Sequence, residues 1–190
     1  MAASPDPRLP QLERLLAGRQ QDPVDERERA SLAAFRAALP ELVRPFDADA
    51  DPTHVTSSAI VVGPPGVLLL KHRLLGIWVQ PGGHLLQRED LAAGALREAV
   101  EETGLSPQHP PGGPRLVHVD VHAGGRGHTH LDLRWLLLAD GEPRPPSGES
   151  QEVAWFAWPA AIARADTGLA GALMGLRPIW GRLIFGGTET

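Results

Sequence analysis

The chain has 190 residues, of which 42% are hydrophobic, and a formal net charge of −5 at pH 7. This length indicates one domain with room for an appendage, and the negative charge argues against bulk nucleic acid as an electrostatic partner. Cysteine is absent, which excludes disulfides, thiolate nucleophiles and cysteine-based zinc sites. There is no apolar run of membrane-spanning length and no apolar signal-peptide core at the start. We therefore expect a cytoplasmic protein that does not enter the membrane.

The first 52 residues are predicted to form a helical extension. Leucines recur there at helical spacing, at Leu9, Leu12, Leu15 and Leu16. The pair Asp22-Pro23 is typical of a helix start, and this second helix should end near Leu39. Residues 45–52, PFDADADP, have the composition of a turn-rich linker. The sequence thus predicts an extension over 1–52 and a second unit over 53–185.

Alternating apolar residues and intervening turn residues predict a set of strands in the second unit. These strands are expected at 56–62, 67–72, 76–79, 115–122, 128–139 and 151–157. The sequence Pro-Gly-Gly at 81–83 should form a tight turn before a helix, and Pro159 should open another helix near the end. The pattern alone favours an α+β protein.

The helix after this turn is predicted to carry an acidic patch. Glu98, Glu101 and Glu102 stand at positions i, i+3 and i+4, which share one face of a helix. Like charges at this spacing repel, and a bound hard divalent cation such as Mg²⁺ removes that cost. Asp90 is expected to cap the start of the helix, and Gly104 to end it in a left-handed conformation.

The same helix should pack through the face opposite the carboxylates. At about 100° per residue, the residues expected on that face are Ala92, Ala93, Leu96, Val100 and Thr103. A solvated acidic face is the alternative interpretation of an isolated EAVEE run.

The full spacing from Gly83 to Leu105 is G-x5-E-x7-R-E-U-x-E-E-x-G-U, with U an aliphatic residue. This pattern resembles the Nudix box, and the chain resembles the Nudix hydrolase superfamily from about Thr53 onward. The runs WVQPGGH and HxHxDLR look like a widespread bacterial Nudix subgroup of undefined substrate, whose members carry a similar N-terminal helical extension. The resemblance implies an α/β fold of the Nudix type, an α/β/α sandwich with a mixed sheet.

The activity that the resemblance implies is metal-dependent hydrolysis of a diphosphate bond in a nucleoside diphosphate derivative, with Mg²⁺ or Mn²⁺ as cofactor. The metal ligands that it implies are Glu98, Glu101, Glu102, a backbone carbonyl at Gly82 and, as a secondary ligand, Glu89. Arg97 would orient the carboxylates through an ion pair. The catalytic base would be Glu98, Glu149 or Glu152.

A second cluster of polar residues lies on the two strands after the box. Alternation puts His118, Asp120 and His122 on one face of the first strand, and His128, His130, Asp132 and Arg134 on one face of the second. If residues 123–127 form the hairpin loop, His122 faces His128, Asp120 faces His130, and His118 faces Asp132.

This hairpin face has several possible roles. It could bind a metal, a phosphate, or the base and ribose of a nucleotide, with zinc the lesser possibility. The alternative without a function is a polar outer face of an antiparallel hairpin. The predicted substrate-binding residues are His118, Asp120, His128, His130, Asp132 and Arg134.

The expected partner is a small nucleotide-like diphosphate, and the N-terminal helices could build a homodimer interface. Nucleoside di- or triphosphates, nucleotide sugars and non-nucleotide pyrophosphates all remain open as substrates. A non-catalytic Nudix-fold sensor that binds a nucleotide and regulates a partner is the alternative function. The intact box favours the enzyme, because binding alone does not need a complete metal face.

Overall fold

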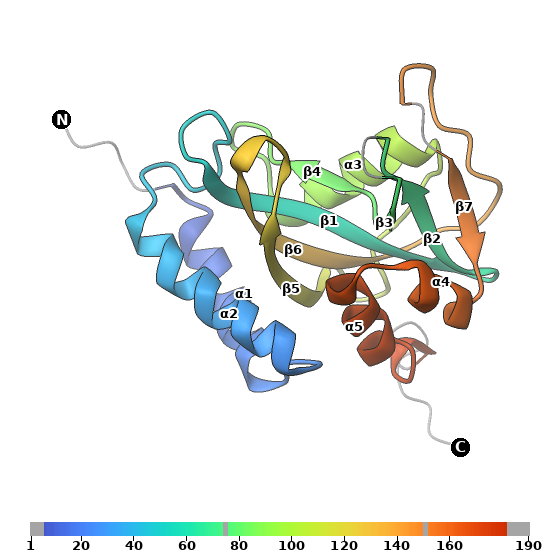
Figure 1. Cartoon of the computed structure of the whole chain (residues 1–190), viewed down its shortest axis with the longest axis horizontal. Helices are drawn as coiled ribbons and strands as arrows, with labels where there is room; N and C mark the ends of the chain where they lie inside the picture. The colour runs from blue at the N-terminus through green and yellow to red at the C-terminus, as the bar shows by residue number, and fades with distance from the viewer. Residues whose placement is uncertain (1–5, 74–75, 150–151, 182–190) are drawn as a thin grey trace.

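The computed structural model describes residues 6–73, 76–149 and 152–181 (Figure 1). The predicted domain end at residue 185 and the first residue of the predicted strand 151–157 lie outside the described residues. The elements in chain order are α1 (Leu9–Gln21), α2 (Glu26–Ala38), a 3-10 turn (Leu39–Glu41), β1 (Thr53–Gly63), β2 (Gly66–Lys71), β3 (Trp78–Val79), β4 (Gly82–His84), α3 (Leu91–Thr103), β5 (Arg115–Ala123), a 3-10 turn (Gly125–Gly127), β6 (Thr129–Leu138), β7 (Val153–Phe156), α4 (Trp158–Arg164) and α5 (Thr167–Leu176). None of the helices described is long and apolar enough to cross a membrane.

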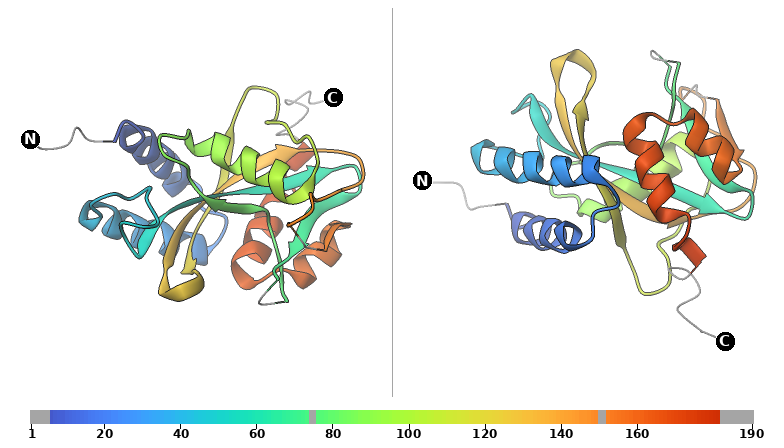
Figure 2. Two further views of the ribbon diagram at one scale, coloured as in Figure 1. Left: turned by 90° about the horizontal axis from the view of Figure 1, so that it is seen from above. Right: turned by 60° about the horizontal axis from the view of Figure 1, so that its bottom comes forward.

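A mixed sheet forms the centre of the molecule, with strand order β3-β2-β1-β6-β5. Strand β1 runs parallel to β6 and antiparallel to β2, while β4 pairs with β1 and β7 with β2. Helix α3 covers one face of this sheet, and helices α4 and α5 cover the other (Figures 1 and 2). The α/β/α sandwich that the resemblance to the Nudix superfamily implies is therefore confirmed.

Two apolar clusters fill the spaces between the layers. The cluster under α3 joins Ala95 and Ala99 of that helix to Leu133 of β6. The cluster under α5 joins Leu169 and Leu173 to the other face of the sheet. Each layer therefore has an apolar side that it can bury only against the sheet.

The N-terminal helices belong to the first of these clusters. Leu12 and Leu16 of α1 and Leu32 and Phe35 of α2 are buried in the same cluster as Ala95 of α3. Helix α2 begins at Glu26 and is capped by Asp25, whose side chain accepts from the Glu28 amide. The predicted helix start at Asp22-Pro23 is thus three residues too early. The division of the chain into an extension over 1–52 and a second unit over 53–185 stays a prediction. The helices of the extension pack in the same apolar core as the second unit.

Helix α2 also closes the edge of the sheet at β5. The carboxylate of Glu28 accepts from the Val119 amide over 2.9 Å, and the Ser31 hydroxyl accepts from the Val121 amide over 3.2 Å. These amides would otherwise be unpaired donors of an edge strand. Glu28 is fully buried and forms an ion pair with Arg19 of α1 at 2.6 Å. One buried glutamate therefore connects both N-terminal helices to the sheet.

Helix α3 has the predicted ends but a different buried face. The Asp90 side chain accepts from the amides of Ala92 and Ala93, and Gly104 adopts a left-handed conformation with φ 68°. The residues of α3 that are buried are Leu91, Ala92, Gly94, Ala95, Ala99 and Thr103. Ala93 and Val100, which the helical wheel places on the packed face, are exposed. The helix is rotated so that its small residues approach the sheet.

Three further details of the predicted fold are wrong. Residues 82–84 form the short strand β4, which pairs with β1, where a tight turn is predicted. The helix predicted from Pro159 is two helices, because Ala165 is extended and Asp166 caps a new start. In the hairpin of β5 and β6, His122 pairs with His130 rather than with His128. The register is shifted by two residues, since the loop is centred one residue later than predicted.

Candidate metal and active site

Arg97 lies at the centre of the acidic patch on α3. Its guanidinium donates to Glu89 at 2.8 Å, to Glu98 at 2.8 Å and to Glu101 at 3.0 Å. A further bond of 2.9 Å runs to the backbone carbonyl of His84, which ties α3 to the end of β4. One guanidinium thereby contacts three carboxylates, and the expectation that Arg97 orients them for a metal stays a prediction.

Two of the predicted metal ligands face the glycines of β4. The Glu102 carboxylate accepts from the Gly82 amide over 2.9 Å. A Cβ atom at Gly83 would stand 2.6 Å from a carboxylate oxygen of Glu98. Only glycine therefore permits Glu98 to approach the strand as closely as it does. The glycine that begins the box, Gly83, is thus required by the close approach of the Glu98 carboxylate.

The pKa values of the carboxyls at this site are shifted in different directions. Burial raises the pKa of Glu102 to about 7, and the neighbouring Glu98, Glu149 and Glu101 carboxylates add to the effect. Burial likewise raises the pKa of Glu98, although Arg97 opposes it. Burial also opposes ionisation of Glu89, but hydrogen bonds from Arg97 and the Leu86 amide outweigh it and hold the Glu89 pKa below its usual value.

These features fit a hard divalent cation. Within the described residues no cationic side chain forms an ion pair with Glu102, although it lies beside Glu98 and Glu101. A metal ion would supply the missing positive charge and would favour the ionised carboxylates. Glu101 has a half-exposed side chain and Glu98 a largely buried one, so the two could reach an ion from different depths. Glu89 is engaged on both oxygens by Arg97 and by the Leu86 amide.

The two late-loop carboxylates lie in different surroundings. Glu149 is close enough to Glu102 to raise the pKa of that carboxyl. Glu152 instead forms an ion pair with Lys71 at 2.9 Å, and its side chain is 68% exposed. The geometry therefore separates two candidates that the sequence leaves equivalent.

Four of the predicted substrate-binding residues are buried in the protein. The exposed fractions are at most 2% for His118, Asp120, Asp132 and Arg134. Arg134 donates to Asp120 at 3.0 Å and to Asp132 at 3.2 Å, and so compensates two aspartates that the register places opposite one another. The alternative interpretation, a polar outer face of the hairpin, is wrong for these four residues.

Neighbouring elements cover this buried network. Arg27 of α2 forms an ion pair with Asp120 at 3.1 Å, and Gly168 of α5 packs against the same carboxylate. The hydroxyls of Thr56 and Ser58 in β1 donate to Asp132. The side chains of Asp120, Asp132 and Arg134 thus have partners inside the protein, whereas the buried Nε2 of His118 has no hydrogen-bond partner among the described residues. Contact of these residues with substrate remains a prediction.

His128 and His130, the other two predicted substrate-binding residues, lie next to the loop of the hairpin. They meet two histidines from elsewhere in the chain, His54 and His84. Burial lowers the pKa of His130 to about 4, and the neighbouring His122, His54 and His84 contribute to this. The sequence did not identify His54, because its proximity arises from the parallel pairing of β1 with β6, in which His54 lies beside His130.

Comparison with known proteins agrees with the fold and the box. A family model described as NUDIX domain matches residues 52–173. A NUDIX-family hydrolase from Clostridium perfringens is 23% identical with a TM-score of 0.57, over 66% of this chain and 97% of that one. An Ap4A hydrolase from C. elegans, solved as a binary complex, is 20% identical with a TM-score of 0.57, over 67% and 97%. A MutT protein from Methanosarcina mazei is 18% identical with a TM-score of 0.55, over 67% and 95%.

The structural likenesses are below 25% identity and show the fold, whereas the family match rests on the sequence of most of the chain. It includes β4, α3 and both strands of the hairpin. The chain therefore belongs to the NUDIX domain family, and this family match over residues 52–173 supports an enzyme of the Nudix pyrophosphohydrolase type.

Proposed function

We propose that this enzyme hydrolyses the diphosphate bond of a nucleoside diphosphate derivative with Mg²⁺ or Mn²⁺ held by Glu98, Glu101 and Glu102. The observation that carries the proposal is the environment of two carboxylates, Glu98 and Glu102. Both are carboxylates with raised pKa values, and both lie against the glycines of β4 without enough positive charge around them. A protein gains nothing in stability from such an arrangement unless a cation binds there.

The proposed ligands are Glu98, Glu101, Glu102 and the backbone carbonyl of Gly82, with Glu89 in a supporting role through Arg97. When bound, the metal neutralises the charge that develops on the phosphoryl group and lowers the pKa of the attacking water. Arg97 keeps Glu98 and Glu101 oriented toward the same side of α3. Loss of that orientation would cost turnover, because misplaced ligands no longer match the reacting geometry.

The reaction makes one P–O bond, breaks another, and moves one proton. The oxygen of water bonds to a phosphorus of the diphosphate, the bridging P–O bond breaks, and the proton of the water passes to a carboxylate of the site. Glu98 and Glu149 are the candidates for this base. The proximity of Glu149 to Glu102 supports its participation, whereas the ion pair of Glu152 with Lys71 speaks against that residue.

A substrate panel tests the proposal and narrows the substrate class. Nucleoside di- and triphosphates, nucleotide sugars, dinucleoside polyphosphates and a non-nucleotide pyrophosphate are incubated with Mg²⁺, with Mn²⁺, or with a chelator. We expect cleavage of at least one nucleotide member that depends on the metal and that chelation abolishes. If no member is cleaved with either metal at saturation, the proposal fails and the non-catalytic nucleotide sensor becomes the better account.

A further inference from the structure

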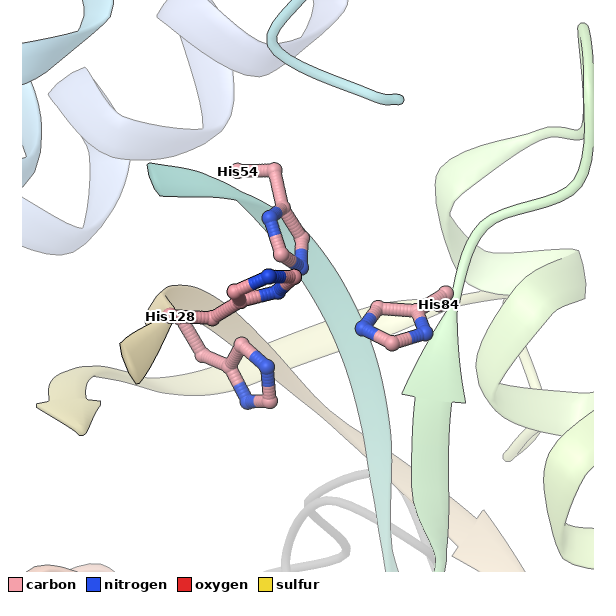
Figure 3. A group of neighbouring side chains, drawn as sticks. His54, His84 and His128 are labelled. Atoms are coloured by element: carbon pink, nitrogen blue, oxygen red, sulfur yellow. The ribbon is translucent and has the colours of Figure 1, made fainter. Parts of the chain in front are cut away.

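Four histidines gather outside the glutamate site. They are His54 of β1, His84 at the end of β4, His128 just before β6, and His130 among the first residues of β6. One nitrogen of each ring lies within 4.8 Å of a nitrogen of every other ring. Figure 3 shows the rings of His54, His84 and His128 approaching a common space from three separate segments of the chain. Ring centroids stand 4.9 Å apart for His54 and His84, and 5.1 Å apart for His54 and His128.

The two ring nitrogens of His54 are in the state expected of a metal ligand. Its side chain is buried, and its Nδ1 lies 3.0 Å from the backbone carbonyl of Asp51. A carbonyl can only accept, so Nδ1 carries the proton and Nε2 carries the lone pair. This Nε2 is buried and has no hydrogen-bond partner among the described residues. A carbonyl that fixes the tautomer and leaves the other nitrogen unpaired is the usual arrangement behind a metal-bound histidine.

Hydrogen bonds between the four rings do not explain why these histidines lie close together. No hydrogen bond joins two of these four rings in the part of the chain that the structure describes. The glycine at position 124 leaves room for the His130 ring, where a Cβ atom would collide with it.

We propose that His54, His84, His128 and His130 form a binding site for one transition-metal ion of the Zn²⁺ class, separate from the glutamate site. Imidazole nitrogens suit Zn²⁺ and similar ions, whereas Mg²⁺ takes oxygen ligands. Nitrogens bound tetrahedrally at about 2.0–2.1 Å from zinc are roughly 3.3 Å apart, so the most distant pair must close by about 1.5 Å at most. His84 is exposed and supplies the freedom for that movement.

The location of the site gives it a structural consequence. It would join the start of β1, the end of β4 and the start of β6, which are far apart in sequence. Strand β4 carries Gly82 and Gly83, which meet Glu102 and Glu98, and the carbonyl of His84 itself binds Arg97. A metal at the histidines would therefore hold the strand against which the box glutamates lie.

Co²⁺ provides a test that does not depend on enzymatic activity. The metal-free full chain is titrated with Co²⁺ in excess Mg²⁺, and the visible spectrum is recorded. Tetrahedral nitrogen ligation gives strong visible bands, whereas oxygen ligation at the glutamates gives weak octahedral bands. We expect strong bands that saturate at one equivalent, that Zn²⁺ removes, and that accompany a rise in Tm.

Variants locate the bound ion. His84→Ala and His128→Ala, at an exposed and a half-buried position, should each weaken Co²⁺ binding at least tenfold. His109→Ala, a histidine outside the cluster, and Glu102→Gln should keep the strong bands. Circular dichroism without metal checks that each variant folds. The proposal is overturned by a wild-type Kd above about 1 mM, by weak octahedral bands alone, or by binding that survives both histidine substitutions.

Discussion

The carboxylate of Glu102 accepts a hydrogen bond of 2.9 Å from the amide of Gly82, which lies 20 residues earlier in the chain. This contact joins the last glutamate of α3 to the strand whose carbonyl is proposed as a ligand. A single amide donor does not compensate a buried negative charge, and the pKa of Glu102 stays raised, at about 7. The negative charge of Glu102 is therefore only partly compensated. Substitution of Glu102 should impair metal binding without impairing folding.

Glu102→Gln should abolish activity and yet stabilise the metal-free protein at alkaline pH. A carboxyl with a folded pKa of about 7 and an ordinary value of 4.5 contributes stability below pH 4.5 that is lost as the pH rises through 7. The neutral amide removes that cost, so we expect a gain of about 1–2 kcal/mol at pH 8. Urea unfolding in a chelator measures it. Equal stabilities of wild type and variant at pH 8 would count against the raised pKa.

The late-loop glutamates should differ in their effect on turnover. Glu149→Gln removes a carboxylate that interacts with Glu102, and we expect a fall in kcat of roughly 10²-fold. Glu152→Gln removes only the exposed ion pair with Lys71, and we expect a change of less than about twofold. Steady-state kinetics at saturating Mg²⁺ compares the two variants. A larger loss in Glu152→Gln than in Glu149→Gln would reverse our assignment.

Glu28 should be one of the most important residues for stability outside the apolar core. Glu28→Ala leaves Arg19 without its buried partner and the Val119 amide without an acceptor. We expect a loss of about 3–5 kcal/mol in the free energy of unfolding. Glu26→Ala is the matched control on the same helix, because the Glu26 side chain is 86% exposed. Urea denaturation that finds similar stabilities for the two variants would show that α2 does not secure the edge of β5.

The protein should lose stability on acidification through its buried histidines. Burial, aided by the positive charge of Arg134, lowers the pKa of His118 to about 3 from its ordinary value of 6.5. A lowered histidine pKa gives stability that is complete above pH 6.5 and is lost as the pH falls toward 3. His130, with a pKa of about 4, acts in the same direction.

In His118→Leu, the free energy of unfolding should change less steeply with pH between 6 and 4. The expected difference in slope is about 1.4 kcal/mol per pH unit. Chemical denaturation at a series of pH values measures both slopes, and identical slopes would mean that His118 titrates normally in the folded protein.

The features that the sequence predicted correctly depend on residues that are close together along the chain. Asp90 and Gly104 cap α3 through contacts within a few positions, so local residue preferences identify both ends. The rotation of α3 about its axis depends on the distant sheet. For that reason Val100 is exposed although the helical wheel places it on the packed face.

The parts that were wrong or missed depend on pairing between distant segments. The two-residue error in the hairpin register arises because a glycine-rich loop fits more than one centre equally well. His54 reaches His130 only through the parallel pairing of β1 with β6, and Glu28 reaches Val119 only after α2 docks at the sheet edge. No local pattern around His54 or Glu28 indicates these contacts.

The central claim is that the carboxylates of α3 hold the metal that makes diphosphate hydrolysis possible. Turnover of the best nucleotide substrate in the panel, at saturating Mg²⁺, tests this most directly in wild type, Glu102→Gln and Glu142→Gln. Glu142, with an 82% exposed side chain, is the control. We predict a fall of at least roughly 10²-fold in Glu102→Gln and wild-type turnover in Glu142→Gln. Wild-type turnover in a folded Glu102→Gln protein would contradict the metal assignment.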